Sequence, residues 1–220
     1  MSLSSSATLA QNGQNWSLSP QMEQAFTLFD TVIGTCAIVW GPGGIVGVSL
    51  PAQDTAETRS HLEQRFPHAI ESKPSAEIAS IVADIQALLQ GEKRDLSSVN
   101  LDLTGIPDFH RKVYAVARAI TQGKTMTYGE ISATLNAPGT ARAVGKALGA
   151  NPFPIIVPCH RILASGGKAG GFSAPGGLET KMRMLNIERA NVPVEPSLFD
   201  QLPLAAPPRR SRSEISGRRR

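Results

Sequence analysis

The possible folds of this chain are constrained most by one short apolar run. It ends in proline, and a cysteine and a histidine follow directly. Residues 155–161 read Ile-Ile-Val-Pro-Cys-His-Arg. β-branched residues favour a buried strand, and proline cannot continue one, so we expect a strand that stops at Pro158 and presents Cys159 in a turn. A neighbouring imidazole or guanidinium lowers the cost of forming a thiolate, and His160 and Arg161 supply both. The run predicts a cysteine nucleophile, although an inert packed cysteine beside a structural histidine is the alternative.

A second pattern precedes this run. Thr127 followed three residues later by Glu130 is a capping box, which starts a helix. Asn136 ends that helix, and Pro138 fits the first turn of a second one. Two short helices joined by a tight turn are typical of a helix-turn-helix.

The second of these helices combines positive charge with small side chains. Arg142 and Lys146 are four residues apart and therefore share one face. Small residues lie around them and allow the helix backbone to approach a nucleic-acid groove closely: Ala141, Ala143, Gly145 and Ala147. An ordinary helical hairpin with solvated charges is the alternative interpretation.

Taken together, residues 108–188 resemble the 6-O-alkylguanine–DNA alkyltransferases, also called methylated-DNA–protein-cysteine methyltransferases. The matching motifs, in the order and near the spacing of that family, are Phe109-His-Arg-Lys-Val-Tyr114, Tyr128-Gly-Glu130, Arg142-Ala-Val-Gly145, Asn151-Pro152, Pro158-Cys-His-Arg161, Gly171-Phe-Ser173, Gly176-Gly-Leu178 and Glu188. The resemblance implies an α/β fold: an N-terminal α+β lobe with a small sheet, and a mostly helical C-terminal lobe with a winged-helix-like helix-turn-helix.

The resemblance also implies an activity. Such proteins repair DNA by direct reversal: they rotate a damaged nucleotide out of the duplex and move its alkyl group to their own cysteine. The expected substrates are 6-O-alkylguanine and, secondarily, 4-O-alkylthymine in double-stranded DNA. The product is a stable thioether, so the enzyme would act once, and no cofactor is implied.

Individual roles follow by resemblance. Cys159 would attack the alkyl carbon, His160 would take the thiol proton through a water, and Glu188 would orient the imidazole, as the acid of a hydrolase triad does. Arg142 would enter the base stack from the minor groove. Tyr128 would crowd the phosphate of the target nucleotide and lie near the base.

Further contacts complete the expected site. The resemblance assigns DNA contacts to Ala141, Arg142, Ala143, Lys146 and Tyr128, and substrate contacts to Asn151, Pro154, Ile162, Phe172 and Ser173. Ala174-Pro175 stands where some relatives have a shorter link, which puts the size of the pocket in question.

Composition narrows the setting. The two cysteines, Cys36 and Cys159, form no disulfide framework, which suits a reducing cytoplasm, and Cys36 is expected to be a packed strand residue. No Cys-x-x-Cys pattern indicates zinc, and we expect no metal site. Residues 1–22 lack the pattern of a secretory signal, and no apolar run is long enough to cross a membrane.

The chain divides into four expected segments. These are a disordered N-terminus (1–22), an α+β domain (23–104), an alkyltransferase DNA-binding and catalytic domain (105–190) and a disordered basic tail (191–220). The expected elements are a hairpin within 32–50, helices at 53–66, 75–90, 108–122 and 175–188, and a short strand near 98–103. Gly105-Ile-Pro107 is the expected hinge between the lobes.

Charge is concentrated in the tail. Of the net charge of +4, residues 191–220 carry +3, so the rest of the chain is nearly neutral and non-specific attraction to DNA would come from local patches. Gln201-Leu-Pro-Leu204 loosely resembles peptides that dock on bacterial sliding clamps, although a disordered linker is the preferred interpretation. We expect a monomer.

Three other functions would each account for part of this pattern. A non-catalytic binder of alkylated DNA would lack the cysteine. A cysteine hydrolase built on Cys159, His160 and Glu188 would need an oxyanion hole and has no use for a helix-turn-helix. A plain helix-turn-helix regulator would not need the Cys-His pair.

Overall fold

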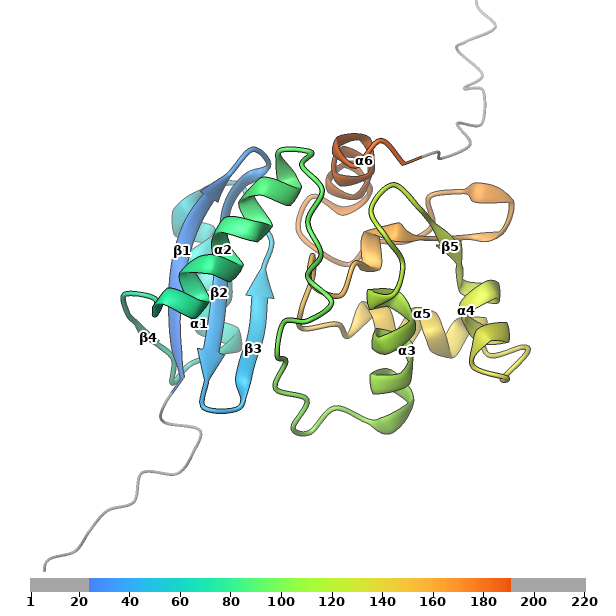
Figure 1. The fold of residues 1–220 in the computed structure, drawn as a ribbon, viewed down its shortest axis with the longest axis horizontal. Helices are drawn as coiled ribbons and strands as arrows, with labels where there is room; N and C mark the ends of the chain where they lie inside the picture. Colours follow the sequence, from blue (N-terminus) through green and yellow to red (C-terminus); the bar gives the residue numbers. More distant parts are fainter. Residues whose placement is uncertain (1–23, 191–220) are drawn as a thin grey trace, which may run out of the picture.

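The computed structural model describes residues 24–190, and the expected disordered segments 1–22 and 191–220 lie outside that range. The chain folds into two lobes that lie side by side (Figure 1). We call residues 24–102 the sheet lobe and residues 108–190 the helical lobe. This is the mixed α/β architecture that the sequence predicts.

The sheet lobe is a small sheet with two helices. Its elements are β1 (Ala25–Thr31), β2 (Gly34–Gly41), β3 (Gly44–Ser49), α1 (Thr55–Arg65), β4 (Ile70–Glu71) and α2 (Ala76–Leu89). The strand order is β3-β2-β1-β4, with β4 parallel to β1 and the other neighbours antiparallel. The predicted hairpin and both predicted helices are confirmed.

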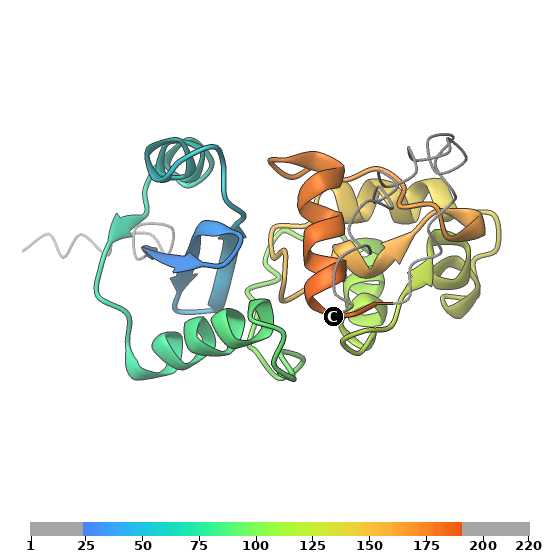
Figure 2. The ribbon, with the colours of Figure 1, turned by 90° about the horizontal axis from the view of Figure 1, so that it is seen from above.

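The core of this lobe follows from the alternation of side chains along β2. Cys36 and Ile38 pack on one face of the sheet with α2, and Ala37 and Val39 pack on the other face with Leu62 of α1. The two helices therefore cover opposite faces, as Figure 2 shows. Cys36 is fully buried, as expected, and burial raises the pKa of its thiol to about 12.

The helical lobe supplies the rest of the described chain. Its elements are α3 (Asp108–Arg118), β5 (Met126–Thr127), α4 (Tyr128–Thr134), α5 (Ala141–Gly149), a 3₁₀ turn (Cys159–Arg161), β6 (Ile162–Leu163), a second 3₁₀ turn (Ser165–Gly167) and α6 (Gly177–Ile187). β5 and β6 pair in parallel beside the helix-turn-helix. None of the helices within residues 24–190 is long and apolar enough to cross a membrane.

The helix-turn-helix forms as predicted at its start. The Thr127 hydroxyl accepts from the Glu130 N–H at 3.1 Å, and the Glu130 carboxylate accepts from the Thr127 N–H at 2.6 Å, which completes the capping box. The prediction that Pro138 lies in the first turn of α5 is wrong. The helix begins at Ala141, because Gly139 has φ of +84° and cannot be helical.

Two further predictions are wrong, and both concern segments next to Arg118. The expected strand near 98–103 is reduced to a single bridge between Leu101 and Ile45, and the expected helix 108–122 ends at Arg118. The Arg118 guanidinium extends from the end of α3 back to this segment. It donates to the carbonyls of Leu96, Ser97 and Val99. These carbonyls are therefore satisfied without a strand partner.

The β3 edge of the sheet contacts both the segment that follows α2 and the helical lobe. Ile45 of β3 exchanges backbone hydrogen bonds with Asn100 and Asp102, at 2.9 and 2.8 Å. Further along β3, the Val48 N–H donates to the Pro152 carbonyl of the helical lobe at 2.9 Å. Arg183 of α6 donates to the carbonyls of Val32 and Ile33. Edge donors that would otherwise be open are thus used for docking.

Candidate functional site

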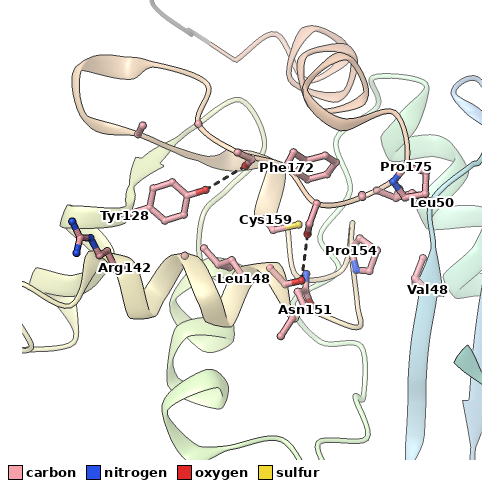
Figure 3. A pocket seen from close by; sticks show the side chains of 18 of the residues that line it. Val48, Leu50, Tyr128, Arg142, Leu148, Asn151, Pro154, Cys159, Phe172 and Pro175 are labelled. Atoms are coloured by element: carbon pink, nitrogen blue, oxygen red, sulfur yellow. Dashed lines mark hydrogen bonds between the residues drawn. The ribbon is translucent and has the colours of Figure 1, made fainter.

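A cavity of about 1210 Å³ lies between the two lobes, beside α5. It is shown in Figure 3 with Cys159 at its centre and Arg142 at one end. Eight residues predicted from the sequence line it: Tyr128, Ala141, Arg142, Asn151, Pro154, Cys159, Phe172 and Ser173. The structure thus brings most of the expected site to one place.

The segment that carries Cys159 is not the strand that the sequence predicts. Residues 154–157 form turns, and Cys159 opens a 3₁₀ turn. Ile155 has φ of +75°, a strained conformation for a β-branched residue. Pro154 and Pro158 cannot donate to a ladder, so the tight turn replaces extended pairing. The apolar composition reflects burial in the core, where Ile155 is 1% exposed.

The side chain of Asn151 braces this turn from the end of α5. Its amide group donates to the Val157 carbonyl at 2.9 Å, and its oxygen accepts from the Phe153 N–H at 2.9 Å. The Val157 N–H closes the turn on the Phe153 carbonyl at 2.7 Å. The Asn151 side chain also lowers the pKa of the Cys159 thiol, against the larger opposing effect of burial. One amide therefore fixes the backbone that leads to the sulfur.

Behind the cysteine lies a fully buried acid–base pair. His160 Nε2 is 2.9 Å from Glu188 Oε1. Hydrogen bonds from His160 and Arg161 overcome the opposing effect of burial and lower the pKa of Glu188 to about 2, so the carboxylate is ionised and can only accept. Nε2 must therefore carry a proton. The other ring nitrogen, Nδ1, is buried without a hydrogen-bond partner among the described residues, which leaves its lone pair available.

Burial lowers the pKa of the His160 imidazole, although Glu188 opposes this shift. At neutral pH the ring is therefore uncharged and can accept a proton at Nδ1. Burial also raises the pKa of the Cys159 thiol, against the effect of the Asn151 side chain and the charge of Lys181. A thiol that stays protonated at neutral pH needs a base before it can react. Nδ1 of His160, the next residue in the chain, can serve as that base.

Arg161 does not act as the sequence suggested. It was expected to stabilise a Cys159 thiolate together with His160, but its guanidinium binds Glu188 with two hydrogen bonds of 2.8 Å and the Ile120 carbonyl at 2.5 Å. The bidentate pair is almost completely buried. Arg161 holds the carboxylate in place rather than contacting the sulfur.

Lys181 of α6 supplies a buried positive charge near the cysteine. The side chain is fully buried, and its amino group donates to the Ile162 carbonyl at 2.5 Å. Burial lowers the pKa of Lys181 to about 8, while the nearby Cys159 sulfur raises it. Ile162 is one of the substrate contacts that the resemblance assigns, and its carbonyl is thus already bound by Lys181.

Tyr128 and Ser173 both line the cavity. The Tyr128 hydroxyl donates to the Gly171 carbonyl at 3.5 Å (Figure 3), and burial raises the pKa of this phenol. The Ser173 hydroxyl donates to the Gly149 carbonyl at 3.3 Å. Both hydroxyls therefore have only long, weak hydrogen bonds to give up on binding a ligand.

The outer face of α5 is open. Arg142, Ala143 and Lys146 are exposed there, while Val144, Ala147 and Leu148 of the same helix are buried. The predicted basic, small-residue face is therefore present, except that Ala147, expected on it, packs in the core instead. Within residues 24–190, no group of three or more His, Cys, Asp or Glu side chains is placed to hold a metal ion.

Sequence reasoning missed Lys181, the Arg161–Glu188 pair and the five sheet-lobe residues that line the cavity: Val48, Ser49, Leu50, His61 and Arg65. Lys181 had a signal, because its spacing places it on the same face of α6 as buried Met184 and Leu185. The sheet-lobe residues had none, since their position depends on how the lobes dock.

The second helix of the helix-turn-helix lines the cavity that holds Cys159, with His160 and Glu188 behind it. This combination is typical of one class: DNA-binding proteins with a cysteine nucleophile. Comparison with known proteins agrees. The family model described as "6-O-methylguanine DNA methyltransferase, DNA binding domain" matches residues 108–190. The methylated-DNA–protein-cysteine methyltransferase of Mycolicibacterium paratuberculosis is 42% identical over 56% of this chain and 72% of the relative. The chain belongs to the methylated-DNA–protein-cysteine methyltransferase family.

Other relatives support this membership over more of the chain. The methylated-DNA–protein-cysteine methyltransferase of Methanothermobacter thermautotrophicus is 34% identical over 69% of this chain and 77% of the relative. The crystal structure of Mycobacterium tuberculosis OGT in complex with DNA matches with a TM-score of 0.61 and 32% identity, covering 75% of this chain and 92% of that one. The likeness therefore includes the sheet lobe as well as the helical lobe.

Proposed function

We propose that this protein repairs DNA by direct reversal, moving a methyl or larger alkyl group from 6-O-alkylguanine, and secondarily from 4-O-alkylthymine, to Cys159. Family membership supports the reaction class. The observation that carries the assignment to this chain's residues is the His160 ring, whose Nε2 is bound to Glu188 and whose Nδ1 is left unpartnered next to Cys159 in sequence.

The reaction is a single displacement at the alkyl carbon. The Cys159 sulfur forms a bond to that carbon as the bond between the carbon and the base oxygen breaks. His160 takes the thiol proton at Nδ1 through a water, and Glu188 stabilises the imidazolium that results. Tyr128 gives its phenol proton to a ring nitrogen of the departing guanine and recovers a proton from solvent, and Ser173 donates a hydrogen bond to the 6-oxygen. The products are guanine and a thioether.

The target nucleotide must leave the duplex to reach Cys159, at a cost of a few kcal/mol. Arg142, exposed on α5, fills the gap in the base stack, and Tyr128 crowds the adjacent phosphate. Ala141, Ala143 and Lys146 contact the DNA backbone along the same helix. Direct contact through small residues suits the narrow minor groove.

The substrate base is held in the cavity by further residues. Pro154 and Phe172 form its walls, Asn151 braces the turn, and the carbonyls of Cys159 and Ile162 accept from the exocyclic amine of guanine. Because Lys181 already donates to the Ile162 carbonyl, the base shares that oxygen with the lysine. A thioether does not hydrolyse under mild conditions, so each molecule acts once and needs no cofactor.

The test is a duplex that carries one 6-O-methylguanine with a radiolabelled methyl group, supplied in excess over the protein and followed by peptide mapping. We expect one label per protein molecule, on the peptide that contains Cys159. The Cys159→Ser variant should take up none, whereas Cys36→Ala, which changes the other, buried cysteine, should behave as the parent. Label on any other peptide, or repair by Cys159→Ser at the parental rate, contradicts the proposal.

Finer predictions from the sequence join this proposal. We assign residues 23–104 and 105–190 to separate domains, and expect a cytoplasmic monomer, to be checked by light scattering and cell fractionation. The proposed sliding-clamp contact at Gln201–Leu204 lies outside the described residues. A tail peptide that shows no binding to a clamp at high micromolar concentration would end that idea.

A further inference from the structure

The cavity is larger than a methylated base requires, and it extends to the sheet lobe. Beyond Pro154 its lining passes to Val48, Ser49 and Leu50 at the end of β3 and to His61 and Arg65 of α1. We call this part the inter-lobe groove. It is continuous with the part of the cavity that holds Cys159, so a group attached to the reacting carbon can extend into it.

The near part of the groove is apolar. Val48 and Leu50 face Pro154 and Pro175 across the cavity, on the far side of Cys159 from Arg142 (Figure 3). A carbon chain or an aromatic ring extending from the sulfur would contact these side chains, and removing its apolar surface from water would favour binding. The groove therefore favours an occupant that is apolar next to the reacting carbon.

The far part of the groove is positively charged. Arg65 occupies the last turn of α1, with its guanidinium 5.1 Å from the ring centre of Phe66 and close enough to buried Tyr114 of the helical lobe for the two to interact electrostatically. Arg65 forms no ion pair with any acidic residue in the described part of the chain. His61 also lines this part of the groove, with its Nε2 atom 3.8 Å from a carboxylate oxygen of Glu57.

The described residues that line the cavity include no aspartate or glutamate, whereas Arg65, Arg142 and His61 are among them. Arg142 lies at the end of the cavity that α5 forms. Arg65 comes instead from the sheet lobe, so the two arginines offer separate positive ends to one continuous space. An arginine without a carboxylate partner at the end of an apolar channel is suited to bind an anion.

We propose that the inter-lobe groove holds the distal part of long 6-O substituents of guanine, and that Arg65 selects substituents that end in a carboxylate. The inference rests on the proposed function, since the occupant is attached to the carbon that Cys159 attacks. It adds a substrate class: lesions with an apolar spacer and an anionic end. The bond-making step is the same displacement, and the distal carboxylate leaves the site on the sulfur.

The test compares two free bases of nearly equal shape, 6-O-(4-carboxybenzyl)guanine and 6-O-(4-carbamoylbenzyl)guanine, of which only the first carries a charge. Free bases remove the contribution of DNA binding. The rate of adduct formation on Cys159 is followed by intact-mass spectrometry, and the ratio of the carboxylate rate to the amide rate is recorded. We expect Arg65→Ala to lower that ratio about three- to fivefold, the range of a partly exposed ion pair, and Arg65→Glu to lower it further.

The matched control is Arg59→Ala on the same helix, because Arg59 is bound to Glu71 and does not line the cavity. This variant should keep the parental ratio. Ser49→Trp should narrow the groove and slow both benzyl bases, with methyl transfer from duplex DNA unchanged. Ser49 is only partly buried, so this change is tolerated more readily than one at fully buried Val48.

The outcomes separate this inference from the proposed function. If Arg65→Ala and Arg65→Glu repair 6-O-methylguanine normally but keep the parental carboxylate-to-amide ratio, the inference is overturned and the function stands. If the Arg65 variants lose activity only on duplex DNA, with the free-base ratio unchanged, the arginine contacts a DNA phosphate and the inference is equally wrong. If the parent fails to take a methyl group onto Cys159, the proposed function itself fails.

Discussion

Replacing Glu188 with glutamine tests the buried relay most directly, because this carboxylate accepts from both His160 and Arg161. Its pKa of about 2 in the folded protein compares with a usual value of 4.5. A depression of about 2.5 units is worth about 3 kcal/mol of folding free energy. Breaking a buried ion pair by removing one partner costs about 3–5 kcal/mol, which agrees. We therefore expect Glu188→Gln to lower the free energy of unfolding by about 3 kcal/mol at pH 7.

The same shift fixes how stability depends on pH. Because the folded pKa is lowered, the contribution of Glu188 is fully present above pH 4.5 and is lost as the pH falls from 4.5 toward 2. The parent should lose stability over that range, and Glu188→Gln should lose less. Urea unfolding followed by tryptophan fluorescence at several pH values measures both free energies.

Methyl transfer should slow as well. A glutamine can donate to Nε2 instead of accepting from it, which would move the ring proton to Nδ1 and remove the base. We expect a loss of about 10²-fold in the single-turnover rate at pH 7, the lower end of the contribution of general base catalysis. The loss should shrink as the pH rises, because ionisation of the Cys159 thiol by solvent then replaces His160.

The matched control is Glu179→Gln, the same chemical change at an exposed position of α6. It should leave both the unfolding curve and the transfer rate within error of the parent. If Glu188→Gln unfolds at the parental urea concentration and transfers methyl at the parental rate, the carboxylate neither anchors Arg161 nor orients His160, and the reasoning is refuted.

Three other outcomes follow from the site. Arg142→Ala should slow repair in duplex DNA more than tenfold and leave the rate with free 6-O-benzylguanine unchanged; an equal loss on both substrates would contradict a role in base flipping. Asn151→Ala should cost about 1–3 kcal/mol in urea unfolding, because a buried carbonyl and N–H lose their partners; an unchanged midpoint would count against the brace. Because the pKa of His160 is lowered, the transfer rate should show no inflection near pH 6.5 and fall only at more acidic pH.

Local rules predicted the parts of the fold that local interactions form. Thr127 and Glu130 satisfy one another within one turn of helix, so their sequence spacing is sufficient to place the start of α4. The alternation of Cys36 to Val39 across the sheet is likewise a property of a single strand. These elements needed no knowledge of distant segments.

The misplaced elements depend on residues far apart in the chain. Residues 155–158 have the composition of a strand, but the Asn151 amide and the positive φ of Ile155 hold them in turns. Arg161 meets Glu188 across 27 residues, and only the packing of α6 on the cysteine turn shows that the guanidinium faces the carboxylate. Sequence propensity carries no information on such pairings, so the role of Arg161 was assigned to the wrong partner.

Because Cys36 is fully buried, the number of reactive thiols differs between the native and the unfolded protein, and between unreacted and alkylated molecules. With only two sulfhydryls in the chain, a reagent such as dithionitrobenzoate should count a single reactive group in the native state and both after denaturation. A spent molecule should count none when native and one when unfolded. The same sample therefore reports, without any isotope, the share of molecules already consumed and the share that has lost its structure.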